Sequence, residues 1–234
     1  MHRADDRNAA WRALAGLVAT VALATATGDL MAEGKHIVYI EASTVNNWKL
    51  DGIAARTGIE RYRFEVLREY DFDKSKKVDQ VLAGGQPRPG AVIVQECAVY
   101  CPGDLQAYQG MYRGWIEKLQ ARGLRPVIAT VVPPARSRGW WQDAKDFAKE
   151  RLLGRPSQFE QVTAFNDWLR ALGAERGVPV LDLERLLRVS AEDRHMRPEF
   201  NAGDGIHLAP VAYQRLDKDL LEFLDRLELQ AASK

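Results

Sequence analysis

Five short stretches of the chain have the hydrophobic pattern of β-strands, and helical patterns separate them. Four are continuous apolar runs, as expected for strands buried on both faces, whereas the second alternates polar and apolar positions, as expected for a more exposed strand. The five predicted strands lie at residues 36–40, 61–67, 91–94, 126–132 and 177–181. The predicted helices lie at 48–56, 73–82, 104–123, 157–175 and 210–227.

Strands that alternate with helices indicate βαβ units, whose right-handed crossovers place helices on both faces of a parallel sheet. The sequence therefore predicts an α/β fold, a flavodoxin-like three-layer α/β/α sandwich around a five-stranded parallel sheet. No internal repeat, low-complexity tract or linker divides residues 30–230, so we expect one domain there. The stretch 135–155 is a looser segment rich in charge, and the stretch 188–208 is expected to be irregular. In such folds, ligands bind beyond the carboxyl ends of the strands.

The N-terminal segment has a different character. Residues 13–26 carry no charge but are too few for a membrane span, which needs about 20 apolar residues. They match the apolar region of a secretory signal, and residues 24–26 (Ala-Thr-Ala) provide the small side chains that a signal peptidase recognises. We therefore expect residues 1–26 to be a leader and the protein to be secreted or periplasmic, without stable membrane insertion after leader removal. A buried N-terminal helix and a retained anchor are the alternatives.

The amino-acid composition argues against some classes of binding partner. The 33 basic and 32 acidic residues balance, which argues against an electrostatic hold on nucleic acid or an anionic membrane. The basic run at 74–77 is interpreted as a solvated helix face. Cys97 and Cys101 would lie about 13 Å apart in a continuous strand, so a disulfide requires a turn between them, and two separate thiols are the alternative. The cysteine and histidine spacings fit no metal site, and we expect no metal or organic cofactor.

The stretch from 201 to 210 carries the most informative chemistry. Asp204 and His207 lie three residues apart in a glycine-flanked loop before the last helix. The carboxylate can accept the imidazole Nδ1–H, which leaves Nε2 free as a base. Such a base activates a serine hydroxyl, and Ser43, after the first strand, is the candidate nucleophile. The alternative is that Asp204 caps the loop and that His207 only packs.

With Ser43 after the first strand and the sequence Asp-Gly-Ile-His-Leu at 204–208, the chain resembles the SGNH (GDSL-type) hydrolases over nearly all of residues 35–228. The resemblance implies a sheet of five parallel strands and the activity of an esterase, a lipase, a carbohydrate O-acetyl esterase or an acetyltransferase. It also implies that Ser43 is the nucleophile, that His207 is the general base, and that Asp204 orients His207.

Three blocks of the sequence depart from the family's pattern. Residues 41–43 read Glu-Ala-Ser where the family has Gly-Asp-Ser, and the region 70–75 contains no glycine. Residues 95–100 read Gln-Glu-Cys-Ala-Val-Tyr where the family has Gly-x-Asn-Asp. Two of the family's three oxyanion donors are therefore not recognisable, and losing one such donor typically lowers the rate by about 10²–10³-fold. The backbone N–H of Ser43 remains.

Four further residues are candidate substrate contacts. Asn46 lies near the nucleophile and can donate to the substrate. Glu96 follows the third strand and can bind substrate or act as an acid or base, and a salt bridge to a nearby Arg or Lys is the alternative. Trp140 and Trp141 follow the fourth strand. Because adjacent residues cannot both face one core, one indole is expected at the mouth of the cleft, and anchoring of both to the protein body is the alternative.

These features together predict a serine esterase or deacetylase whose substrate is a small-molecule or carbohydrate ester, such as an O-acylated envelope component. An acyltransferase that uses the same three residues is a close variant. The competing class is a non-catalytic module that binds a glycan or a partner in an export or polysaccharide-assembly system. The presence of Ser43, Asp204 and His207 favours the enzyme, whereas the missing glycine and asparagine blocks favour the binding module.

Overall fold

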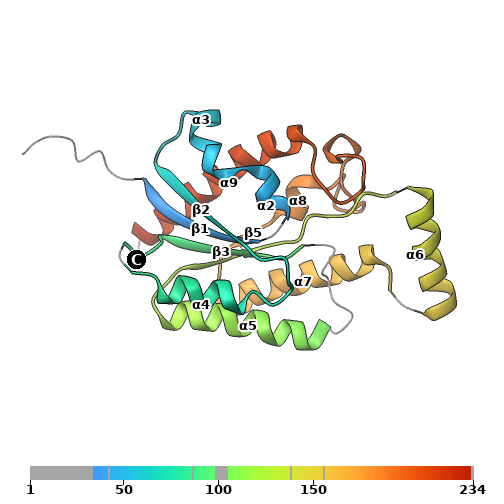
Figure 1. Ribbon diagram of the computed structural model, residues 1–234, viewed down its shortest axis with the longest axis horizontal. Coiled ribbons are helices and arrows are strands. Elements are labelled where there is room, and N and C mark those ends of the chain that lie inside the picture. Colours follow the sequence, from blue (N-terminus) through green and yellow to red (C-terminus); the bar gives the residue numbers. More distant parts are fainter. Residues whose placement is uncertain are drawn as a thin grey trace, which may run out of the picture. The chain divides into compact units, whose positions relative to one another are not determined.

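The computed structural model describes residues 34–41, 43–85, 87–97, 105–137, 139–154 and 156–232. Within these residues, five parallel strands form one sheet in the order β2-β1-β3-β4-β5 (Figure 1). The strands are β1 (Lys35–Glu41), β2 (Tyr62–Arg68), β3 (Ala91–Gln95), β4 (Pro126–Ala129) and β5 (Val180–Leu181). The five-stranded parallel sheet that the sequence predicts is therefore confirmed.

Helices cover both faces of the sheet, because successive strand residues point to opposite sides. In β1, Ile37 and Tyr39 belong to one apolar core, whereas Val38 and Ile40 belong to the other. The first core is completed by α2 (Ser43–Trp48), α3 (Ile53–Thr57), α8 (Leu183–Leu187) and α9 (Pro210–Ala232). The second core is completed by α4 (Ser75–Ala83), α5 (Leu105–Ala121) and α7 (Gln158–Arg176). Figure 1 shows these two helical layers above and below the sheet, which confirms the three-layer sandwich.

The single helix predicted at 48–56 is wrong: α2 ends at Trp48, where that helix was expected to begin, and α3 covers only Ile53–Thr57. The segment of α2 itself was not predicted to be helical, because it is rich in β-branched residues and asparagine, which have modest helix propensity. The buried Glu41 side chain compensates, because its Oε2 accepts the N–H of Val45 at 2.9 Å. Lys49, with a φ of 51°, then ends α2 and leads into the 3₁₀ turn η1 (Leu50–Gly52).

Two stretches in which the sequence predicts no helix or strand contain helical turns. The segment 135–155 includes α6 (Trp140–Leu153), which is rich in charge and in which Phe147 and Leu152 are exposed. The stretch 188–208 includes the 3₁₀ turn η3 (Pro198–Phe200). The helix α6 within the looser segment 135–155 was therefore not predicted from the sequence.

The expected leader, residues 1–26, lies outside the described residues. From Lys35 onward the chain forms one compact unit. In the part of the chain that the structure describes, no helix is long and apolar enough to cross a bilayer.

Gly173 marks the tightest contact between α7 and the sheet. A Cβ placed there would lie 2.3 Å from Val180 Cγ2 and 2.9 Å from the carbonyl oxygen of Val178. Gly173→Ala is therefore expected to destabilise the protein by about 1–3 kcal/mol, although alanine is the better helix former. Gly114→Ala in α5 is the matched control, because its Cβ would meet nothing within 4 Å, and it is expected to stabilise by about 0.5–1 kcal/mol. Urea denaturation measures both, and equal effects would contradict the packing argument.

Candidate active site

The loop before α9 is held in shape by its own polar side chains. Asn201 Oδ1 accepts the N–H groups of Gly203 and Gly205, each at 2.9 Å. Both glycines have positive φ values, 111° and 76°, a conformation that side chains with a Cβ rarely adopt. An antiparallel bridge between Asn201 and Leu208 closes the loop. The sequence therefore builds a rigid support for the two residues that carry the candidate chemistry.

Asp204 and His207 form the pair that their spacing predicts. Asp204 Oδ1 accepts the N–H groups of Ile206 (2.9 Å) and His207 (2.8 Å), and Oδ2 accepts from His207 Nδ1 at 2.5 Å. Burial raises the pKa of Asp204, but the hydrogen bonds from the His207 ring and from the two amides outweigh it and lower this pKa to about 2. The carboxylate is therefore ionised at neutral pH, and His207 Nε2 is left free to accept a proton.

Ser43 is the first residue of α2 and lies at the carboxyl end of β1. Its side chain is half-buried, and its Oγ lies 3.5 Å from the Sγ of Cys97, which follows β3. Glu41, two residues earlier, is fully buried and caps α2, and burial raises the pKa of its carboxyl. The hydroxyl thus sits where the carboxyl ends of β1 and β3 meet, the edge at which ligands bind in open α/β sheets.

Contacts of α2 and α3 with α9 join the helix that begins at Ser43 to the helix that follows the loop of Asp204 and His207. Trp48 Nε1 donates to Asp217 Oδ1 at 2.7 Å, and the Arg56 guanidinium donates to both Asp217 oxygens at 2.8 Å. The ring of Tyr213 packs at 6.3 Å from that of Trp48. Burial raises the pKa of Tyr213, with smaller contributions from the carboxylates of Glu41 and Asp204.

Among the described residues, Ser43 Oγ and His207 form no hydrogen bond. Bonds between a nucleophile and its base are often long before substrate binds and shorten in the reacting complex. The structure thus shows the Asp204–His207 half of the predicted triad formed, and it shows Ser43 at the same edge.

The prediction that Glu96 contacts substrate is corrected by its burial. Glu96 is 1% exposed, so its carboxyl has almost no contact with solvent. Its Oε1 is 2.8 Å from Lys74 Nζ, and its Oε2 accepts the hydroxyl of Tyr108. The alternative, a salt bridge to a nearby basic residue, matches the structure. Lys74 is itself fully buried, so the interpretation of the run 74–77 as a solvated face is wrong at its first position.

Burial raises the pKa of Glu96 to about 8, although Lys74 opposes the shift. Because the folded protein holds this proton more tightly than the unfolded chain, Glu96 favours folding below its usual pKa of 4.5, and that contribution is lost as pH rises towards 8. We expect the free energy of unfolding of the wild type to fall between pH 5 and pH 8 relative to that of Glu96→Gln. Urea denaturation of both proteins at the two pH values measures this, and parallel pH dependences would contradict it.

The structure locates the other candidate substrate contacts only in part. Asn46 is half-buried in α2, one turn after Ser43. Trp140 and Trp141 begin α6, but their side chains lie outside the described residues, as does Cys101. The segment that leads to α6 does border the loop of Asp204 and His207, since Ala135 N–H donates to Gly205 O at 2.9 Å. Figure 1 shows α6 beyond the edge at which the strands end.

Sequence reasoning missed two organising residues, Asn201 and Lys74. An asparagine just before a glycine-rich loop is a recognisable signal, because its side chain readily accepts from amides two or more residues on. Lys74 has no such local signal, because its partner Glu96 is 22 positions away.

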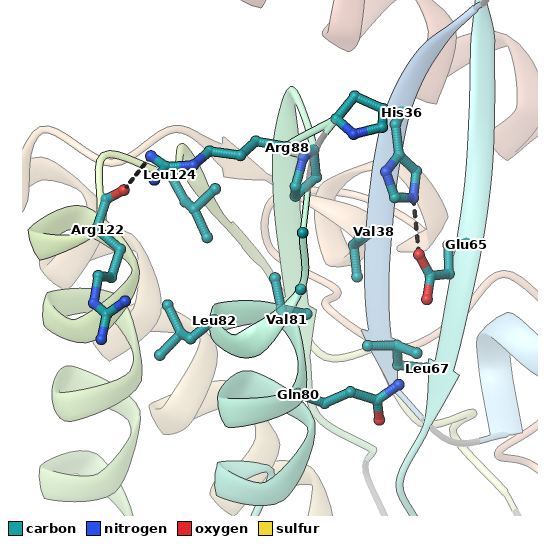
Figure 2. A pocket seen from close by; sticks show the side chains of 14 residues that line it. His36, Val38, Glu65, Leu67, Gln80, Val81, Leu82, Arg88, Arg122 and Leu124 are labelled. Atoms are coloured by element: carbon teal, nitrogen blue, oxygen red, sulfur yellow. Dashed lines mark hydrogen bonds and ion pairs between the residues drawn. The ribbon is translucent and has the colours of Figure 1, made fainter.

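Two cavities, of about 350 and 440 Å³, are lined by residues of β1 and β2 and by residues near the amino end of β3. Figure 2 shows the first, where His36 Nε2 lies 2.9 Å from Glu65 on one side and Arg88 donates to the carbonyl of Arg122 on the other. Ser43, Asp204 and His207 are not among the residues that line these two cavities. Among the described residues, no group of three or more His, Cys, Asp or Glu side chains is arranged to hold a metal ion.

No family model matches the sequence, and no curated protein is similar enough to match it. Solved structures do resemble it. A GDSL-like lipase from Bacteroides thetaiotaomicron has a TM-score of 0.61 at 12% identity, over 87% of this chain and 94% of that one. A catalytic mutant of an acetylxylan esterase from Geobacillus stearothermophilus has a TM-score of 0.54 at 12% identity, over 82% and 94%. The OSK domain of Drosophila Oskar has a TM-score of 0.52 at 12% identity, over 80% and 86%.

The likeness to the lipase and the esterase shows that the chain has the fold of the SGNH hydrolases. It extends over nearly the whole length of those proteins. At these identities the likeness concerns the fold alone, because one fold can carry many functions.

Proposed function

We propose that this protein is a serine ester hydrolase of the SGNH type, with Ser43 as nucleophile, His207 as general base and Asp204 as its orienting partner. The observation that carries the proposal is the Asp204–His207 contact at 2.5 Å in a loop tied to the same sheet edge as Ser43. An ionised Asp204 holds Nδ1–H and keeps Nε2 available, as proton abstraction from a serine requires.

In the proposed reaction, Ser43 Oγ attacks the carbonyl carbon of the ester while His207 Nε2 takes its proton. The tetrahedral oxyanion is stabilised by backbone N–H groups, that of Ser43 among them. The C–O bond to the alcohol then breaks, and His207 returns the proton to the leaving oxygen. Water, deprotonated by His207, hydrolyses the acyl-enzyme and restores Ser43.

We further propose an O-acylated carbohydrate or another envelope ester as the substrate. Likeness to an acetylxylan esterase supports this class, since that protein's name specifies an acetylated polysaccharide. The test is the release of acetate from an aryl acetate and from O-acetylated xylan. Release above the rate of Ser43→Ala is the expected result, and no release from any ester would contradict the proposal. Transfer of the acyl group to an added sugar acceptor would instead identify an acyltransferase.

The competing function is a binding module for a glycan or a protein partner. The substitution of Gln95-Glu96-Cys97 for the family's Gly-x-Asn block favours it, because the position of the asparagine is taken by Cys97, whose thiol is only a weak hydrogen-bond donor. A module of this kind would retain glycan affinity in the Ser43→Ala variant and show no turnover in the wild type. Calorimetry with acetylated and deacetylated oligosaccharides separates the two functions.

We also propose that the protein is exported and that residues 1–26 are its leader. The uncharged segment 13–26 followed by a small-residue cleavage pattern supports this. N-terminal sequencing of the protein from its host is expected to find a start near Thr27. A full-length product in the cytosol would contradict export.

A further inference from the structure

Lys74 is a fully buried lysine that the proposed reaction does not use directly. Its Nζ donates to Glu96 Oε1 at 2.8 Å and to the backbone carbonyl oxygens of Glu69 at 2.9 Å and Asp71 at 2.5 Å. An ammonium group has three protons, so these three acceptors satisfy it completely. Glu96 can accept this hydrogen bond even when its carboxyl is protonated, because the carbonyl oxygen of the neutral form also has a lone pair. Lys74 therefore connects the end of β3 to the loop that follows β2.

This connection determines the orientation of the peptide groups in the loop that follows β2. In a planar trans peptide, the C=O and N–H groups point in opposite directions. Because the carbonyls of Glu69 and Asp71 point at the buried ammonium, the next N–H groups, those of Tyr70 and Phe72, point away from it. Among the described residues, these two amides donate to no acceptor. The side chains of Tyr70 and Phe72 are 53% and 44% exposed, so this part of the loop reaches the surface.

Both ends of the connection adjoin the nucleophile. On one side, Cys97 follows Glu96 directly, and its Sγ lies 3.5 Å from Ser43 Oγ. On the other side, the N–H of Glu69 donates to the carbonyl of Glu41 at 3.2 Å, two residues before Ser43. The loop with its two unused amides thus begins at the same sheet edge as the candidate nucleophile.

We propose that Lys74 is a positioning residue for the oxyanion site. Held by Glu96, it fixes the loop after β2 so that the N–H of Tyr70 or Phe72 joins that of Ser43 in binding the oxyanion. A buried lysine thereby takes over the task of the glycine and asparagine blocks that this sequence lacks. The inference rests on the proposed ester hydrolysis and adds to it the origin of a second oxyanion donor.

The test measures kcat and KM for an aryl acetate in three variants, together with the melting temperature of each. Lys74→Met removes the three donors. The double variant Lys74→Met/Glu96→Gln also removes the three donors, but it leaves no buried carboxyl without its lysine. Its glutamine can still form a hydrogen bond with Tyr108. This variant replaces the single variant in the test if Lys74→Met folds poorly. Lys76→Met, at an exposed lysine two positions on, is the matched control. Hydrogen exchange across residues 69–73 reports whether the loop has loosened.

Loss of a properly placed oxyanion donor lowers kcat by about 10²–10³-fold. We expect this loss in both Lys74 variants, with KM changed little, faster exchange in 69–73, and wild-type kinetics in Lys76→Met. Folded Lys74 variants with kcat near that of the wild type would overturn the inference while leaving the proposed function intact. A wild type that hydrolyses no ester would instead overturn the proposed function, and with it the catalytic role of Lys74.

Discussion

Replacing Ser43 with alanine is expected to lower kcat for ester hydrolysis by about 10⁶-fold, the loss seen when a serine hydrolase is deprived of its nucleophile. His207→Ala is expected to lower kcat equally, because a serine hydroxyl is a very weak nucleophile unless a base takes its proton. The double variant should therefore be no slower than either single variant. Steady-state hydrolysis of an aryl acetate measures all three.

A matched control separates this loss from a general effect of removing a hydroxyl. Ser190 lies in a surface turn, where its Oγ accepts the N–H groups of Glu192 and Asp193. Ser190→Ala is expected to keep the wild-type kcat. If the loss of kcat in Ser43→Ala/His207→Ala equalled the product of the losses in the two single variants, the two residues would not share a catalytic step. Full activity in either single variant would also contradict the proposal.

Two substitutions of Asp204 separate its two tasks. Asp204→Asn retains an oxygen for the amides of Ile206 and His207 but loses the charge that orients the imidazole, so kcat is expected to fall by about 10⁴-fold with the loop intact. Asp204→Ala loses both tasks, so kcat is expected to fall at least as far and the loop 201–208 to become less ordered.

Kinetics and hydrogen exchange of residues 201–208 measure these two effects. Faster exchange in the alanine variant alone is the expected pattern. If Asp204→Asn retained kcat within tenfold of the wild type, the carboxylate would have only the structural task of holding the loop.

Most of the fold could be predicted because its strands carry their signal locally. The apolar run from Ile37 to Ile40 is buried on both faces, and the alternation in β2 reflects its place at the edge of the sheet. The helix of Ser43 and α6 were missed for physical reasons. The first depends on a buried carboxyl outside the helix, that of Glu41, and the second carries dense charge.

The site was predictable to the extent that its chemistry is local in sequence. Asp204 and His207 belong to one loop, so their spacing alone predicts their contact. The environment of Ser43 could not be predicted, because it depends on contacts between distant segments: Cys97 beside the hydroxyl, and Lys74 bound to Glu96. Burial of a lysine follows from such tertiary partners and has no periodic signature, which is why the run 74–77 was interpreted as exposed.

Reaction of the wild-type protein with a fluorophosphonate probe, followed by mass spectrometry of the digested protein, tests most directly whether Ser43 is an activated nucleophile. We expect a single adduct on the peptide that contains Ser43, no adduct in Ser43→Ala, and strongly slowed labelling in His207→Ala. Labelling at another serine, or an unlabelled wild type at probe concentrations that label a known serine hydrolase, would contradict the proposed triad.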